Sequence, residues 1–246
     1  MSSLAGSNQS RPSGQQPAVQ RSFVPLQSGD RWAPSFRWER TNHRLAKRCL
    51  DVFGACIFLL AFLPLLLMVA VLVRLSSPGP ILLRQARVGK HGRAIRIYKF
   101  RTMFANSDPT IHEAYCRSLV RGSAKPVDGM FKLGNDPRIT RMGRIVRRFS
   151  LDELPQLLNV LKGDMSLIGP RPPLPYEVDL YDERAQLRLS VTPGLTGLWQ
   201  VSGRNTLDFH EMVALDLEYI ARWSFWLDLL ILMRTPLTLV TARGAR

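Results

Sequence analysis

Cysteine is scarce in this chain, and its few cysteines exclude two classes of protein. The chain has 246 residues, and Cys49, Cys56 and Cys116 are its 3 cysteines. An odd and irregularly spaced set gives neither a disulfide framework nor the paired spacing of a zinc site. We therefore expect neither a disulfide-stabilised secreted domain nor a structural zinc protein.

Acidic residues are also few. Asp and Glu total 19 against 34 Lys and Arg, so the formal net charge is +15 and the pI is about 10.8. A surplus of this size favours anionic partners such as phosphates, nucleic acid or an acidic membrane surface. Hydrophobic residues at 46% exclude wholesale disorder, and the length allows one domain with appendages.

Residues 1–44 are predicted to be a disordered basic tail. Ser, Gln, Pro and Gly make up more than half of residues 1–30, a composition that buries too little apolar surface to offset its ordering entropy. Trp32, Phe36 and Trp38 then alternate with arginines. Aromatic and cationic residues mixed in this way suit a membrane interface, although a solvated linker is the alternative.

A second segment, residues 45–75, is predicted to contact a membrane. It contains no charged residue from Val52 to Val73, and a helix over that run would be about 33 Å long, enough to cross a hydrocarbon core. Pro64 lies near the middle, where it deletes one backbone hydrogen bond and clashes with the carbonyl of Leu60. Lys and Arg are equally numerous on the two flanks, so both ends could stay on the cytoplasmic side. The residues alone leave a re-entrant and a spanning helix equally open.

The segment that follows predicts a small β-hairpin and a basic helix. Residues 81–88 and 94–100 read as two strands, and alternation places Lys99 and Arg101 on one face at the exit of the second. Residues 138–149 place apolar side chains at helical spacing among five arginines. Such a helix could lie among anionic headgroups, or pack on a core and present its arginines to a polyphosphate or to DNA. The apolar positions are Ile139, Met142, Ile145, Val146 and Phe149.

An acidic pair follows the basic helix. Ser150 and Glu153 have the spacing of a capping box, and a helix dipole would favour Asp152 and Glu153 in its first turn. Pro155 argues that the helix begins a residue or two later. Functionally, one carboxylate could attack phosphorus while the other holds a divalent cation. Arg147 and Arg171 are forked donors suited to phosphate.

Several long motifs occur in a fixed order and carry a family resemblance. They cover residues 45–52, 97–103, 135–172, 193–205 and 223–235. Together they resemble the monotopic polyprenyl-phosphate phosphoglycosyl transferases, bacterial sugar transferases of the undecaprenyl-phosphate hexose-1-phosphate type. The resemblance extends over roughly residues 45 to 244 and departs from some relatives at Leu63, where they have Ser.

The resemblance implies a reaction and the residues that carry it. Such enzymes transfer a sugar-1-phosphate from a UDP-sugar to polyprenyl phosphate and release UMP, the first membrane step of exopolysaccharide, capsule or O-antigen synthesis. Asp152 matches the nucleophile that forms an aspartyl-phosphosugar intermediate, and Glu153 matches the Mg²⁺ ligand. Cations expected around the phosphates are Arg147, Arg171, Lys99 and Arg204, with Arg101 beside Lys99. Pro64 matches the break of a re-entrant helix.

The expected fold is α+β and mostly helical, with a small β-hairpin or sheet, amphipathic interfacial helices and one re-entrant, Pro-broken membrane helix. Residues 76–246 would form a catalytic domain on the cytoplasmic side of the inner membrane. The expected partners are a UDP-sugar (glucose or galactose), undecaprenyl phosphate and membrane lipids, without nucleic acid, and a homo-oligomer is compatible with the sequence.

Weaker candidates and two alternative functions complete the expectations. Asp136, Asp164 and Asp216 could be further metal ligands, although a cap or a surface carboxylate is the commoner role. Trp223 and Trp226 suit either an interface or a core. The alternatives are a membrane-tethered nucleic-acid binder, for which Asp152→Asn would be harmless, and an inactive interaction protein of polysaccharide assembly.

Overall fold

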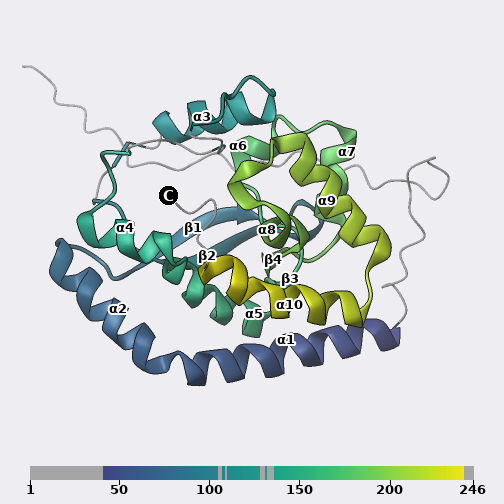
Figure 1. Ribbon diagram of the computed structural model, residues 1–246, viewed down its shortest axis with the longest axis horizontal. Helices are drawn as coiled ribbons and strands as arrows, with labels where there is room; N and C mark the ends of the chain where they lie inside the picture. Colours follow the sequence, from purple (N-terminus) through teal and green to yellow (C-terminus); the bar gives the residue numbers. More distant parts are fainter. Residues whose placement is uncertain (1–40, 105–106, 109, 128–130, 132–135, 241–246) are drawn as a thin grey trace, which may run out of the picture.

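The structure, a computed structural model, describes residues 41–240 apart from 105–106, 109, 128–130 and 132–135 (Figure 1). Residues 1–40, most of the predicted tail, lie outside the described part. The described chain is mostly helical, as expected, and has two small two-stranded sheets, of which the sequence predicted the first. Its helices are α1 (Thr41–Ala61), α2 (Leu63–Ser76), α3 (Thr110–Val120), α4 (Arg141–Arg148), α5 (Leu157–Lys162), α6 (Pro175–Val178), α7 (Glu183–Gln186), α8 (Leu198–Ser202), α9 (Phe209–Arg222) and α10 (Phe225–Val240). Short 3₁₀ turns occupy Lys90–Gly92, Leu151–Gln156, Leu187–Ser190 and Arg204–Thr206.

The apolar segment forms a bent pair of helices. α1 and α2 meet at 64°, and the break falls at Phe62, two residues before Pro64. Pro64 lies in the first turn of α2, where its missing N–H costs least, and it has no N–H to offer the carbonyl of Leu60. Within the described residues no single helix is long and apolar enough to cross a membrane, but the bent pair together meets that requirement of length and composition.

Two helix boundaries differ from the expectation. α1 begins at Thr41 and so includes the last residues assigned to the tail. The basic helix expected over 138–149 shortens to α4, because Ile139 forms a β-bridge with Met103 and the hydroxyl of Thr140 caps the helix by accepting from the Gly143 amide. Val146 is buried, whereas Ile145 and Phe149 are exposed, so the apolar stripe only partly faces the core.

The predicted hairpin is confirmed. β1 (Leu82–Val88) pairs antiparallel with β2 (Ala94–Phe100), with Leu82 opposite Phe100 and Val88 opposite Ala94. The 3₁₀ turn that joins them has His91 and Gly92 at positive φ, 55° and 76°. At the end of β1, the amide of Val88 donates to the carbonyl of Pro173, which ties the hairpin to the loop that carries Arg171.

The second sheet brings two distant loops together. β3 (Ser166–Ile168) pairs parallel with β4 (Gly194–Thr196). A Cβ on Gly194, the first residue of β4, would lie 2.1 Å from the amide nitrogen of Gly169, which follows β3, so only glycine allows the two backbones to approach this closely. The Gly194 amide also donates to the carbonyl of Pro170, which fixes the start of the Gly169–Pro173 loop.

The main core lies above α1 in the view of Figure 1. It joins one side of α1 to α5, β2, β3, α9 and α10, and its buried members include Ala55, Ile97, Leu157, Ile168 and Ile231. A second cluster packs α3 and α7 against α9, and a third packs α2 against β2 and α4. The hairpin and the acidic segment after α4 are therefore held between the bent helix pair and the rest of the chain.

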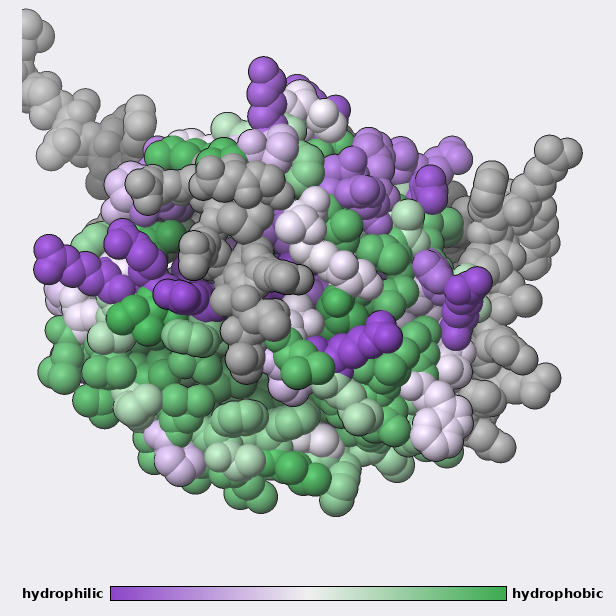
Figure 2. Space-filling view, viewed as in Figure 1, coloured by the Kyte–Doolittle hydropathy of each residue, from purple (hydrophilic) through white to green (hydrophobic). Residues whose placement is uncertain are grey.

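The outer sides of α1, α2 and α10 are apolar and exposed. Figure 2 shows hydrophobic residues gathered along the lower face, where α1 and α2 run in Figure 1. Large exposed side chains on this face are Leu45, Phe53, Ile57, Leu60, Leu67, Met68, Val71 and Leu75, and α10 adds Trp226, Leu230, Met233 and Leu237. Trp226 is 74% exposed, whereas Trp223 is buried in the core, one of the two places expected for these tryptophans.

Candidate functional site

The acidic pair lies on a 3₁₀ turn between α4 and α5. The predicted capping box is wrong: Ser150 is left-handed (φ 54°), and its side chain does not cap a helix. Leu151–Gln156 form a 3₁₀ segment and α5 begins only at Leu157. Pro155 explains the difference, because in an α-helix its ring would clash with the carbonyl of Leu151 and one backbone hydrogen bond would be lost.

Two cations hold the carboxylates. Lys99, which leaves β2 beside the 3₁₀ segment, places its Nζ 3.0 Å from Oε1 of Glu153 and 3.7 Å from Oδ2 of Asp152. Arg171 donates to the same Oε1 of Glu153 at 2.9 Å. Glu153 is thus paired twice at short distance, whereas Asp152 has one longer contact.

The surroundings shift the two carboxyl groups in opposite directions. Burial raises the pKa of Asp152, the negative charge of Glu153 adds to this, and Lys99, Arg147 and Arg171 oppose it. Burial would also raise the pKa of Glu153, but the charges of Arg171 and Lys99 and their hydrogen bonds outweigh it and hold that pKa well below the usual range. Carboxyl groups with opposite shifts in one site are typical of groups with different chemical roles.

Two further predicted arginines lie around the pair. Arg147, exposed at the end of α4, donates from Nε to the hydroxyl of Thr102, and its charge acts on Asp152. Arg204 donates to the hydroxyl of Ser150, and its other terminal nitrogen, Nη1, is buried without a partner among the described residues. Burial lowers the pKa of Arg204, as does the charge of Arg171, while Glu153 and Asp152 raise it.

Arg101 is placed elsewhere. β2 ends at Phe100, and the guanidinium of Arg101 is buried against the C-terminal end of α2, where it donates to the carbonyls of Ser77 and Pro78. The predicted pairing of Lys99 with Arg101 on one strand face is therefore not observed. These contacts fix the turn after α2 and engage Arg101 away from the carboxylates.

The sequence analysis missed two residues beside the site. Arg87 is buried in β1, donates to the carbonyl of Pro172, and lines a narrow cleft together with Lys99, Arg171 and Gln156. Burial lowers the pKa of Arg87, and the charge of Arg171 adds to this. Gln156 is 3% exposed, and its Nε2 has no partner among the described residues. β1 also carries Arg84 and Gln85, so no pattern in the sequence set Arg87 apart.

The donor set fits a magnesium ion bound partly by substrate. Mg²⁺ is usually held by one or two carboxylates together with phosphate oxygens and water, and Asp152 and Glu153 provide two. Lys99 and Arg171 both engage Oε1 of Glu153, so neither takes Oε2. Within the described residues no group of three or more His, Cys, Asp or Glu could hold a metal ion.

The weaker metal-ligand candidates do not join the pair. Asp136 forms an ion pair with Arg138. Asp216, which lies in α9, forms a buried ion pair with Arg188. Asp164 follows the C-terminal end of α5, where its amide donates to the carbonyl of Asn159. Each of these three aspartates therefore makes contacts outside the acidic pair.

With this geometry in view, comparison with known proteins gives the family. A family described as bacterial sugar transferase matches residues 42–242. The chain belongs to this family. The resemblance inferred from the motifs is thereby confirmed, and the acidic pair and its cations all lie within the matched part of this sugar transferase.

Comparison with individual relatives gives the same family. The sugar transferase is 41% identical over 201 residues to the exopolysaccharide production protein ExoY of Rhizobium meliloti, covering 82% of this chain and 88% of ExoY. It is 43% identical over 210 residues to a UDP-glucose:undecaprenyl-phosphate glucose-1-phosphate transferase of Caulobacter vibrioides, covering 82% of this chain and 72% of that protein. To the galactosyl transferase CpsE of Streptococcus agalactiae it is 42% identical over 213 residues, covering 86% of this chain but only 46% of CpsE. The chain thus spans about half the length of CpsE.

Proposed function

We propose that this sugar transferase moves a hexose-1-phosphate from a UDP-hexose, with glucose or galactose preferred, to undecaprenyl phosphate and releases UMP. This would be the first membrane step of exopolysaccharide, capsule or O-antigen synthesis. The names of the relatives in Caulobacter vibrioides and Salmonella typhimurium, the second an undecaprenyl-phosphate galactose phosphotransferase, support both substrates.

The observation that carries the proposal is that the two carboxylates differ in their ion pairs and in the direction in which their pKa is shifted. Glu153 is held ionised by Lys99 and Arg171, which makes it a fixed anion suited to a cation. Asp152 is 7% exposed, is less compensated and has a raised pKa, so its anion is the more basic of the two and the better nucleophile. A nucleic-acid binder would have no use for a buried acidic pair among its cations.

The reaction follows as two displacements at one phosphorus. A carboxylate oxygen of Asp152 forms a bond to the phosphorus that bears the sugar, and the bond from that phosphorus to the oxygen of UMP breaks, so UMP leaves with the electron pair. A phosphate oxygen of undecaprenyl phosphate then attacks the same phosphorus. The aspartyl bond breaks, which restores the carboxylate and gives the sugar-diphosphate lipid. One site can therefore serve a soluble donor and a lipid acceptor in turn.

The remaining cations stabilise the charge of the phosphates. Within the part of the chain that the structure describes, only Nε of Arg147 is engaged, so its terminal nitrogens can be directed to phosphate oxygens. Nη1 of Arg204, which has no partner there either, is a second donor. When bound, Mg²⁺ would neutralise diphosphate oxygens and stabilise the leaving UMP. Glu153, with Asp152 beside it, would hold the ion.

We also propose that the bent pair α1–α2 enters the cytoplasmic leaflet and returns to the same side. The exposed apolar face of α1, α2 and α10 supports this, because lipid would cover side chains that are otherwise left in water. Amphipathic α4 and α10 would then lie at the interface, with residues from 76 onward on the cytoplasmic side. The catalytic carboxylate would be held at the depth of the acceptor phosphate.

UMP release tests the reaction. We expect membranes containing the wild type to release UMP from UDP-glucose or UDP-galactose when Mg²⁺ and undecaprenyl phosphate are supplied. Asp152→Asn should lower the rate by at least about 1,000-fold, since removing a nucleophile costs factors of this order or more. Asp179→Asn, the same change at an exposed residue, should keep the wild-type rate. Full activity of Asp152→Asn would contradict the mechanism, and competition between the two donors would identify the sugar.

Cysteine labelling tests the membrane topology. Single cysteines at Thr41 and Lys125, in a variant whose three native cysteines are replaced by serine, flank the bent pair. With a re-entrant pair, an impermeant reagent should label both from the same side of sealed vesicles. Labels that appear on opposite sides would show that the pair spans the membrane.

A further inference from the structure

A cavity of about 260 Å³ lies away from the acidic pair, between the first half of α1 and the segments around β3 and α9. It shares no lining residue with the cleft beside Glu153. Its polar rim carries four cations and one carboxylate: Arg44, Lys47, Arg48, Lys90 and Asp51. The proposed reaction uses none of these residues, so the cavity needs a separate explanation.

The positive charge at the cavity has a built structural basis. Arg48 donates from both terminal nitrogens to the carbonyls of Val160 and Leu161, at 2.6 and 2.7 Å, at the C-terminal end of α5. No carboxylate of the described residues lies within ion-pair distance of its guanidinium. Its charge is therefore fixed beside the cavity by carbonyl dipoles and is not cancelled by an acidic partner.

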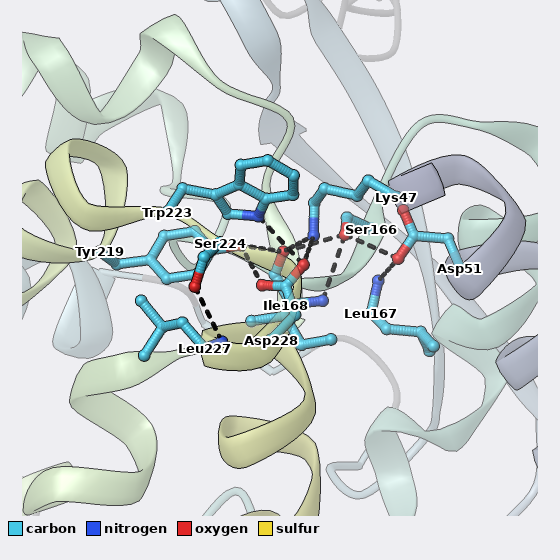
Figure 3. A network of polar contacts seen from close by, with 10 residues as sticks. All are labelled: Lys47, Asp51, Ser166, Leu167, Ile168, Tyr219, Trp223, Ser224, Leu227 and Asp228. Atoms are coloured by element: carbon cyan, nitrogen blue, oxygen red, sulfur yellow. Dashed lines mark hydrogen bonds and ion pairs between the residues drawn. The ribbon is translucent and has the colours of Figure 1, made fainter. Parts of the chain in front are cut away.

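The carboxylate on the rim is turned toward the protein. Figure 3 shows Asp51 reaching Ser166 and Leu167 of β3, where its Oδ1 accepts from the serine hydroxyl and from the leucine amide. Asp51 is 5% exposed. Both contacts engage Asp51 inside the protein, and Lys47 is likewise engaged by the buried carboxylate of Asp228 at 2.8 Å. The positive charge that a ligand would meet therefore comes from Arg44, Arg48 and Lys90.

The wall of the cavity is apolar. Val191, Ile220 and Trp223 line it together with Met165 and Tyr219. The hydroxyl of Tyr219 and the indole nitrogen of Trp223 are both directed to Asp228, as Figure 3 shows, so their rings supply hydrophobic surface. A cationic rim over an apolar wall fits an anion that carries an apolar substituent.

The cavity also lies at the edge of the exposed apolar face. Arg44, Lys47, Arg48 and Asp51 lie on one side of α1 at helical spacing, while Leu45 and Phe53 on its other side are 61% and 70% exposed. A ligand in the cavity would therefore sit where that apolar face meets the polar body of the protein.

We propose that this cavity binds an anionic phosphate group with an apolar substituent, the chemistry of an anionic phospholipid, at a site separate from the acidic pair. The positive charges of Arg44, Arg48 and Lys90 attract the phosphate, and Trp223 and its apolar neighbours contact the substituent. Occupation would anchor α1 to α5 and α9 at the level of the lipid headgroups. The same phosphate chemistry could be supplied by a soluble molecule, and the test separates the two sources.

Binding to the purified full chain in a non-ionic detergent tests the proposal. The lipid probe is dihexanoyl phosphatidylglycerol below its micelle concentration, with dihexanoyl phosphatidylcholine as its zwitterionic match; inorganic phosphate and UMP are the soluble probes. We expect the anionic lipid to bind and to raise the thermal midpoint. Binding should weaken about fivefold in Arg44→Gln, the loss of one nearby cation, and should vanish in Val191→Phe, which fills the cavity.

Controls keep the test decisive. Arg96→Gln removes one exposed cation outside the cavity, and Asp152→Asn changes the acidic pair, so both should bind as the wild type does. A soluble probe whose binding is lost in Val191→Phe would support the phosphate site and name a soluble source. Equal binding of both lipids, no binding of any probe, or binding unchanged in both Arg44→Gln and Val191→Phe would overturn the proposal. Arg44 is exposed, so its variant remains informative if Val191→Phe does not fold.

Discussion

Lys99 is the residue at which the electrostatics of the acidic pair can be tested most directly. Its ammonium lies 3.0 Å from Glu153 and 3.7 Å from Asp152, and all three side chains are at most 20% exposed. At an effective dielectric constant of about 20, such distances correspond to attractions of about 5.5 and 4.5 kcal/mol. Desolvation offsets much of this, so the net loss on removing one partner is nearer to about 3 kcal/mol.

Lys99→Met should therefore change both stability and the pH dependence of the reaction. The folded protein holds the pKa of Glu153 below its unfolded value, so this carboxyl stabilises the fold above about pH 4.3 and loses that effect as the pH falls through its folded pKa. Lys99→Met should lower the free energy of unfolding by about 3 kcal/mol at pH 7, and the difference should shrink in acid. Denaturation followed at several pH values measures it.

The transferase activity of Lys99→Met should be lost at a higher pH than that of the wild type as the solution is made more acidic. Lys99 lowers the pKa of Asp152, so its removal raises that pKa and leaves less of the nucleophile ionised at a given pH. A loss of about 1.4 kcal/mol of net attraction lowers the ionised fraction tenfold on the acidic limb. The acidic limb of kcat should move to higher pH, whereas Lys125→Met, at an exposed lysine, should leave it in place. An unmoved limb, or one moved to lower pH in a folded variant, would refute the reasoning.

Two further variants test contacts outside the acidic pair. Asp228→Asn removes a fully buried charge that Lys47 Nζ meets at 2.8 Å, so we expect a loss of about 3 kcal/mol in unfolding free energy, against none for Asp179→Asn. Arg101→Met deprives the carbonyls of Ser77 and Pro78 of a charged donor and should cost about 1.5–3 kcal/mol. Because Arg101 points away from the acidic pair, KM for the UDP-sugar should not change. A rise in KM with unchanged stability would show that Arg101 binds a phosphate of the substrate, as the sequence analysis expected.

Local features of the fold could be predicted from the sequence. The hairpin of β1 and β2 followed from two strand-like runs on both sides of a glycine-rich turn, and the antiparallel pair is confirmed. The break in the apolar segment followed from Pro64, because a missing N–H and a ring clash act within one helical turn. Both predictions depended on interactions between residues close in sequence.

Predictions failed where a local pattern met a competing constraint. Ser150 and Glu153 matched a capping box, but Pro155 and the left-handed Ser150 favoured a 3₁₀ turn, and the Ser150 hydroxyl accepts from Arg204 instead. Arg101 shared an alternation pattern with Lys99, but β2 ended one residue too early. Neither outcome is visible from spacing alone.

The arrangement of the site itself could be predicted only in part. The motif identified Asp152 and Glu153, but the pairing of Glu153 with Lys99 joins residues 54 positions apart. The role of Arg87 depends on the chain returning at Pro172, 85 positions later. Such contacts depend on tertiary packing, which no pattern of neighbouring residues encodes.

The ion pair between Lys47 and Asp228 has a consequence for biosynthesis. These residues are 181 positions apart, and Asp228 also accepts from Tyr219 and Trp223. During synthesis α1 leaves the ribosome long before α10. The ammonium of Lys47 therefore stays solvated until residue 228 has left the exit tunnel. The α1 helix can adopt its final packing only after residue 228 has been synthesised, and termination before that residue would leave Lys47 without its counterion.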